Sequence, residues 1–297
     1  WLGLPREEVI GKLEGKADHL AEAAEPGNVG VVAAAEAGAH DDRGANQRAG
    51  LHRLQLADAG LVGIGAGRTK APLGGEVEHL AADHAAEAAG YTDALLREIE
   101  MEADSVLHQS APIHAVYFGG GTPSALSARD LARIITALRE RLPLAPDCEI
   151  TIEGRVLNFD DARINACLDA GANRFSIGIQ SFNSKIRKKM ARTSDGPTAI
   201  AFMESLVKRD RAAVVCDLLF GLPGQDAQTW GEDLAIARDI GLDGVDLYAL
   251  NVLPNTPLGK AVENGRTTVP SPAERRDLYL QGCDFMDDAG WRCISNS

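Results

Sequence analysis

The first 90 of the 297 residues lack several amino acids that ordinary folded domains contain. They have no Ser, Cys, Phe, Tyr or Met, and Trp1 is their only large aromatic residue. Ala and Gly dominate, so that runs such as "VVAAAEAGAH" bury little apolar surface to offset the entropy lost on ordering. The composition predicts that residues 1–90 are an atypical segment, either poorly ordered or not in the native reading frame.

The chain is also short of positive charge and of long apolar runs. It has 30 Lys and Arg against 43 Asp and Glu, a net charge of −13, whereas proteins that bind nucleic acid need clustered basic residues. No stretch reaches the roughly 18–20 apolar residues that cross a bilayer, and no basic leader precedes an apolar run. We therefore expect a cytoplasmic protein that binds neither nucleic acid nor membranes.

Cysteine is sparse, and its spacing is uninformative. Five scattered cysteines, an odd number, argue against a secreted disulfide framework, and no pair has metal-ligand spacing. The sequence predicts small buried apolar side chains at these positions and no metal site. His114 is similarly interpreted as a core or rim residue rather than a haem ligand. The cysteines are Cys148, Cys167, Cys216, Cys283 and Cys293.

From Tyr91 onward, helical patterns alternate with short apolar runs. Residues 91–297 are therefore predicted to form one α/β domain, in which right-handed βαβ units build a parallel sheet or barrel. A capping pattern at Ser127 and Asp130 marks one helix start, and Gly171 and Gly241 mark two helix ends. The predicted strands are 113–118, 148–153, 173–179, 212–220 and 244–250, and the predicted helices are 91–107, 128–142, 159–171, 196–210 and 226–241.

Polar residues and glycines gather where these strands end, which is where chemistry concentrates in such folds. The glycine triplet opens the backbone to a ligand, but it has neither the G-x-G-x-x-G spacing nor a Walker lysine. The features, in chain order, are Gly119, Gly120, Gly121, Thr122 and Pro123, then Glu153, Gln180, Asp217 and Asn251.

Each of these features also has a purely structural interpretation. A carboxylate at Glu153 or Asp217 is costly in an apolar strand unless it faces a ligand or a cation, but either could cap a helix or pair with a nearby arginine. The candidate partners are Arg155, Arg174 and Arg192. Gln180 could be a hydrogen-bonding rim residue without a ligand. Five such features at five successive strand ends favour a binding site.

The motifs "YFGGGTPSALS", "EITIEG", "NRFSIGIQSF" and "DLLFGLPGQ", with "AR" before "TSD", resemble radical S-adenosylmethionine enzymes of the oxygen-independent coproporphyrinogen oxidase type. The resemblance implies a partial (β/α)6 TIM-like barrel, incomplete at its N-terminus, that binds S-adenosylmethionine. By this resemblance, Gly120, Gly121 and Thr122 hold the methionine amino group, while Glu153 and Gln180 bind the ribose. Arg192 meets the methionine carboxylate, and Asp217 and Asn251 line the remaining pocket.

The residues after Glu153 point to one branch of this family. Coproporphyrinogen oxidases and haem chaperones usually continue with Ala-Asn-Pro, whereas this chain has Gly154, Arg155 and Val156. It looks more like the anaerobic haem-degrading radical S-adenosylmethionine methyltransferases (HutW/ChuW type). That branch implies a haem or other porphyrin substrate, ring opening by methyl transfer with iron release, and a flavodoxin-like or other low-potential electron donor. A coproporphyrinogen III oxidase and a non-enzymatic haem-binding or trafficking protein remain alternatives.

The family's [4Fe–4S] cluster is held by a C-x-x-x-C-x-x-C loop, which this sequence lacks. The resemblance places that loop, after the first barrel strand, where the cysteine-free segment 1–90 stands. Either the protein is a degenerate relative without radical chemistry, or residues 1–90 do not represent the native protein. The abrupt change of composition favours the second explanation, with the first strand missing and the C-terminus truncated. As written, the chain is expected to be inactive, and its catalytic residues are unknown.

Overall fold

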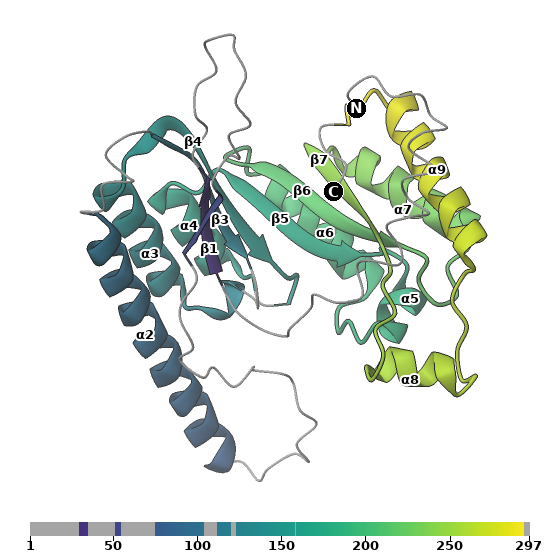
Figure 1. Ribbon diagram of the computed structural model, residues 1–297, viewed down its shortest axis with the longest axis horizontal. Coiled ribbons are helices and arrows are strands. Elements are labelled where there is room, and N and C mark those ends of the chain that lie inside the picture. The colour runs from purple at the N-terminus through teal and green to yellow at the C-terminus, as the bar shows by residue number, and fades with distance from the viewer. Residues whose placement is uncertain are drawn as a thin grey trace, which may run out of the picture. The chain divides into compact units, whose positions relative to one another are not determined.

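The computed structural model describes residues 30–34, 51–54, 75–103, 112–119, 123–157 and 159–293, with side chains from residue 88 onward (Figure 1). Most of the predicted atypical segment therefore lies outside the described residues. The chain divides into two compact units. The first comprises Gly27–Gly178 and Leu206–Val215, and the second includes Ile179–Ser205 and Cys216–Ser297.

The first unit is a sheet with helices. Its strand order is β2-β1-β3-β4-β5, and the pairing of β3 with β4 and of β4 with β5 is parallel, as predicted. Its elements are β1 (Gly30–Ala34), β2 (Leu51–Leu54), α2 (Gly75–Ala103), β3 (Ile113–Gly119), a 3-10 turn η3 (Pro123–Ala125), α3 (Ala128–Arg141), β4 (Leu144–Gly154), α4 (Asp161–Ala170) and β5 (Arg174–Gln180), whose last two residues belong to the second unit.

The outer strands of this unit differ from the purely parallel pattern. Strand β1 pairs antiparallel with both β2 and β3, so that the main-chain groups along the free edge of β3 find partners. Helix α2 begins at residue 75, earlier than the predicted residue 91, and packs beside α3 (Figure 1). The sequence pattern predicted neither β1 nor β2, because strands of four or five residues carry little periodicity.

Local signals explain the helix ends of the first unit. The Ser127 hydroxyl accepts a hydrogen bond from the Asp130 N–H at 3.1 Å, which confirms the predicted start of α3. Asp160 caps α4 in the same way, and Gly171 ends it at φ 108°, a left-handed conformation that favours glycine. Val116 of β3 and Ile150 of β4, which lie opposite each other in the register, are both buried, so this face of the sheet forms core.

The second unit contains α5 (Ser184–Lys189), most of α6 (Gly196–Val207), most of β6 (Ala213–Phe220), α7 (Ala227–Ile240), β7 (Gly244–Ala249), α8 (Pro257–Glu263) and α9 (Pro272–Asp288). Helix α9 packs against α7 and β7 (Figure 1). The indole N–H of Trp230 on α7 donates to the Leu278 carbonyl oxygen at 2.8 Å. Within the part of the chain that is described, none of the helices is both long and apolar enough to cross a membrane.

Candidate functional site

In the first unit, the ends of β3 and β4 bring a tyrosine to a carboxylate. The Tyr117 hydroxyl donates to Glu153 Oε1 at 2.7 Å. Tyr117, Gly119 and Glu153 share one face of the sheet, because Phe118 lies opposite Ile152 in the register and side chains alternate along a strand. The prediction did not include Tyr117. Its position two residues before Gly119, on the same face, is the signal that could have found it.

The first glycine of the triplet has a structural reason within the unit. A Cβ at Gly119 would lie 2.8 Å from the Tyr117 ring and 3.4 Å from the Glu153 carboxyl carbon. Glycine therefore lets the ring lie along the strand and reach the carboxylate. The predicted ligands Gly120, Gly121 and Thr122 lie outside the described residues.

The proposed arginine partners of Glu153 are engaged elsewhere or exposed. Arg174 donates to the Thr151 hydroxyl at 3.3 Å and lies 3.9 Å from Glu149, while Arg155 is exposed. Glu153 itself is half-buried at the end of β4. A carboxylate offers about four acceptor positions, so the bond from Tyr117 leaves acceptor capacity for the two hydroxyls of a ribose.

Gly154, which follows Glu153, is fixed by packing. A Cβ at this position would lie 2.5 Å from the ring of Phe159 and 3.1 Å from Ile177. Phe159 is 1% exposed and meets Phe175 edge to face, with ring centroids 5.2 Å apart. The ring closes over the end of β4, so the packing of Phe159 requires a residue without a side chain after Glu153.

In the second unit, Gln180 ends β5 with two unusual features. Its φ is 66°, a left-handed conformation that costs a non-glycine residue about 1–3 kcal/mol and is often found at functional sites. Its side-chain oxygen is buried and has no hydrogen-bond partner among the described residues. A buried acceptor without a partner is costly, and a ligand hydroxyl would satisfy it.

The other predicted ligands lie in or after separate elements of the second unit. Arg192 is half-buried after α5, and its N–H donates to the Arg187 carbonyl oxygen at 2.9 Å. Asp217 is half-buried within β6, and Asn251 is exposed just after β7. Their roles toward S-adenosylmethionine stay predictions.

The described cysteines do not fit an iron–sulfur cluster. Cys148, Cys167 and Cys216 are buried on different elements. Burial raises the pKa of Cys167 to about 12 and holds that of Cys216 well above its usual value, so neither thiolate forms readily. Among the residues with described side chains, no three His, Cys, Asp or Glu groups could hold a metal ion.

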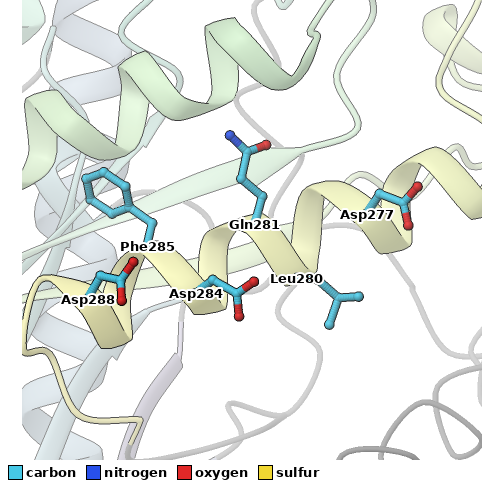
Figure 2. Close-up of a pocket in the computed structure, with 6 residues that line it drawn as sticks. All are labelled: Asp277, Leu280, Gln281, Asp284, Phe285 and Asp288. Atoms are coloured by element: carbon cyan, nitrogen blue, oxygen red, sulfur yellow. The ribbon is translucent and has the colours of Figure 1, made fainter.

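A surface pocket of about 480 Å³ runs along α9 (Figure 2). Figure 2 shows Gln281 and Phe285 on one side of the helix. Gln281 donates to the Ala227 carbonyl oxygen at 2.9 Å, and Arg238 lies 5.4 Å over the Phe285 ring. The remaining lining residues are Leu280 and the carboxylates Asp277, Asp284 and Asp288. No predicted ligand lies here, and the negative lining does not suit an anionic porphyrin.

The Radical SAM superfamily profile matches residues 88–237, and the chain belongs to this superfamily. Membership implies S-adenosylmethionine and a [4Fe–4S] cluster as cofactors. Over 209 residues the chain is 96% identical to anaerobilin synthase of Escherichia coli O157:H7, a match that covers 70% of this chain and 47% of that protein.

Two further comparisons agree with this family. The heme chaperone HemW of Synechocystis sp. is 32% identical over 201 residues, covering 68% of this chain and 48% of the relative. The structure of coproporphyrinogen III oxidase (HemN) from Escherichia coli matches with a TM-score of 0.61 and 24% identity, over 72% of this chain and 48% of that one. This confirms the predicted partial barrel fold. The chain spans about half the length of the curated relatives it matches.

Proposed function

We propose that this chain is the cofactor-binding part of an anaerobic radical S-adenosylmethionine enzyme that opens the haem ring and releases iron. The single observation that carries the proposal is the 96% identity to anaerobilin synthase over 209 residues. The Glu153-Gly154-Arg155 continuation supports the same branch by its resemblance to the haem-degrading enzymes, and the packing of Phe159 explains why glycine stands at position 154. Haem or another porphyrin is the substrate, the protein is cytoplasmic, and a flavodoxin-like or other low-potential protein is the electron donor.

Residues at the carboxyl ends of the strands bind S-adenosylmethionine. When bound with its cluster, this cofactor supplies the radical and methyl-transfer chemistry of the family. Glu153 accepts hydrogen bonds from the ribose hydroxyls while Tyr117 holds its Oε1. Gln180 accepts from the ribose through its buried oxygen, and Arg192 pairs with the methionine carboxylate. The backbone of Gly120 and Gly121, with Thr122, receives the amino group, and Asp217 and Asn251 line the rest of the pocket.

The five cysteines of this chain do not suit a [4Fe–4S] cluster, because three of them are buried on different elements. We propose that residues 1–90 stand in place of the first barrel strand and the C-x-x-x-C-x-x-C loop, so this chain binds the cofactor without turning it over. Anaerobic iron–sulfur reconstitution of the chain, followed by reductant and S-adenosylmethionine, tests this point. Formation of 5′-deoxyadenosine would contradict it.

The substrate is tested with a full-length protein in which the cysteine loop is restored. Incubated anaerobically with haem, reductant and S-adenosylmethionine, it should bleach the Soret band and yield an open tetrapyrrole that is detectable by mass spectrometry. A protein that consumes coproporphyrinogen but leaves haem intact would instead support the oxidase. One that binds haem without altering it would support a trafficking role such as the HemW relatives' name suggests.

A further inference from the structure

The turn that carries Gln180 is held by two buried charged residues. Arg187 on α5 is 2% exposed, and Asp233 on α7 is 1% exposed. Charged side chains are rarely this buried unless their hydrogen bonds are satisfied. Both contact the segment 179–183, which links β5 to α5, and all of these residues belong to the second unit.

Arg187 brackets Gln180 from both sides. Its Nη1 donates to the carbonyl oxygens of Ile179 at 2.8 Å and of Ser181 at 3.0 Å. Nε and Nη2 donate to the carbonyl oxygen and the hydroxyl of Ser194, at 2.8 and 2.6 Å. The Arg187 carbonyl oxygen also accepts from the Arg192 N–H. The Arg187 guanidinium therefore holds the turn at residues 179–181 by hydrogen bonds and connects it to the segment that carries Ser194 and Arg192.

Asp233 holds the same turn from α7. Its Oδ1 accepts from the Phe182 N–H at 2.7 Å, whereas Oδ2 is buried and has no partner in the described part of the chain. Desolvation raises the pKa of Asp233 to about 6, and the neighbouring polar groups of Ser181, Phe182 and Asn183 oppose this shift. At neutral pH the group is therefore mainly a carboxylate.

A third contact closes the turn. Gly196, at the start of α6, lies so near the Phe182 carbonyl oxygen that a Cβ would collide with it, and its N–H donates to the Ser184 hydroxyl at 2.9 Å. Contacts from three helices thus hold the segment in which Gln180 keeps its left-handed φ. Strain of this kind persists only where the surroundings over-determine it.

We propose that Asp233 and Arg187 are positioning residues that keep Gln180 in the conformation that binds S-adenosylmethionine. The inference rests on the proposed function, because it takes Gln180 as a ribose ligand. The ionised Asp233 is central, since hydrogen bonds to a charged acceptor are about twice as strong as neutral ones. An asparagine keeps an oxygen for Phe182 but removes the charge.

The test compares Asp233→Asn with Asp226→Asn, a matched change on the same helix, where Asp226 caps α7 away from the turn. Titration of the full chain with S-adenosylhomocysteine should show about five-fold weaker binding for Asp233→Asn and less than two-fold change for Asp226→Asn. In a Gln180→Ala background, Asp233→Asn should add less than two-fold. The proposal is overturned if Asp233→Asn weakens binding equally in the Gln180→Ala protein and in the parent, or if it weakens binding in neither.

Amide hydrogen exchange reports on the turn without any ligand. Peptides covering residues 179–183 should exchange faster in Asp233→Asn and in Arg187→Lys, with the melting temperature of Asp233→Asn not lowered. If the unmodified chain fails to bind S-adenosylhomocysteine, the proposed function fails for this chain, and the exchange data alone decide the positioning role. Unchanged exchange in both variants contradicts it, as does exchange that rises only together with global unfolding.

Discussion

Replacement of Gly154, the residue after Glu153 at the end of β4, by alanine should destabilise this protein. The new Cβ would lie 2.5 Å from the Phe159 ring. That ring cannot move away, because it is 1% exposed and packs on Phe175. Overpacking typically costs about 1–3 kcal/mol, while the stiffer unfolded chain returns about 0.4–1 kcal/mol. A net loss of about 1–2 kcal/mol follows.

Urea unfolding followed by circular dichroism measures this loss, which corresponds to a fall of about 2–8 °C in melting temperature. Gly90→Ala in α2 is the control, since a Cβ at that position would have no other atom within 4 Å and alanine in a helix should stabilise by about 0.5–1 kcal/mol. In a Phe159→Leu background, Gly154→Ala should cost little. A Gly154→Ala protein as stable as the parent would refute the packing argument.

Three further predictions follow from individual contacts. Tyr117→Phe should weaken S-adenosylhomocysteine binding by about three- to ten-fold, as titration calorimetry would show, and should have no such effect once Glu153 is replaced by alanine, which leaves no acceptor for the Tyr117 hydroxyl. The raised pKa of Asp233, about 6 against an ordinary 3.8, means that the native state binds this proton more tightly. Relative to Asp233→Asn, the unfolding free energy should therefore fall by about 2.4 kcal/mol between pH 4 and pH 7, and parallel urea curves for the two proteins would contradict this. Cys167 and Cys216 should resist a thiol reagent until the protein unfolds, because burial raises both pKa values; rapid native-state labelling at either would be the contrary result.

The stability prediction for Asp233 depends on the groups around it. Arg187 from α5 feels its charge, Cys216 from β6 lies near it, and Glu232 on its own helix raises its pKa. Desolvation is nevertheless the largest cause. Because the buried charge of Asp233 lowers the free energy of unfolding at neutral pH, this residue does not stabilise the fold. It instead fits a role in shaping the turn at residues 179–183.

Periodicity was enough to predict most of the second half of the chain. The five predicted strands and the helices between them are confirmed, because each has either an apolar run or a strong amphipathic pattern with a cap. Helices α5 and α8 are absent from the prediction because they have only six and seven residues. Helix α9 was missed although its capping box at Ser271 and Glu274, with a proline at its start, was visible in the sequence.

The strand-end positions of Glu153 and Gln180 were predictable, but what holds them was not. Tyr117 meets a residue 36 positions later, and Asp233 meets Phe182 across 51 positions. Such contacts depend on strand order and helix packing, which local patterns do not specify. The left-handed φ of Gln180 is likewise imposed by the turn, since no glycine or asparagine marks it in the sequence.

We propose that this chain binds S-adenosylmethionine although its sequence has no cluster loop. The most direct test is titration calorimetry of the purified chain with S-adenosylhomocysteine. This measurement reports binding alone, so it requires neither a cluster nor turnover. We expect saturable binding with one site per chain, weakened in Glu153→Gln and in Gln180→Ala and unchanged in Asp226→Asn. Absence of binding, or binding that neither of the first two changes alters, would contradict it.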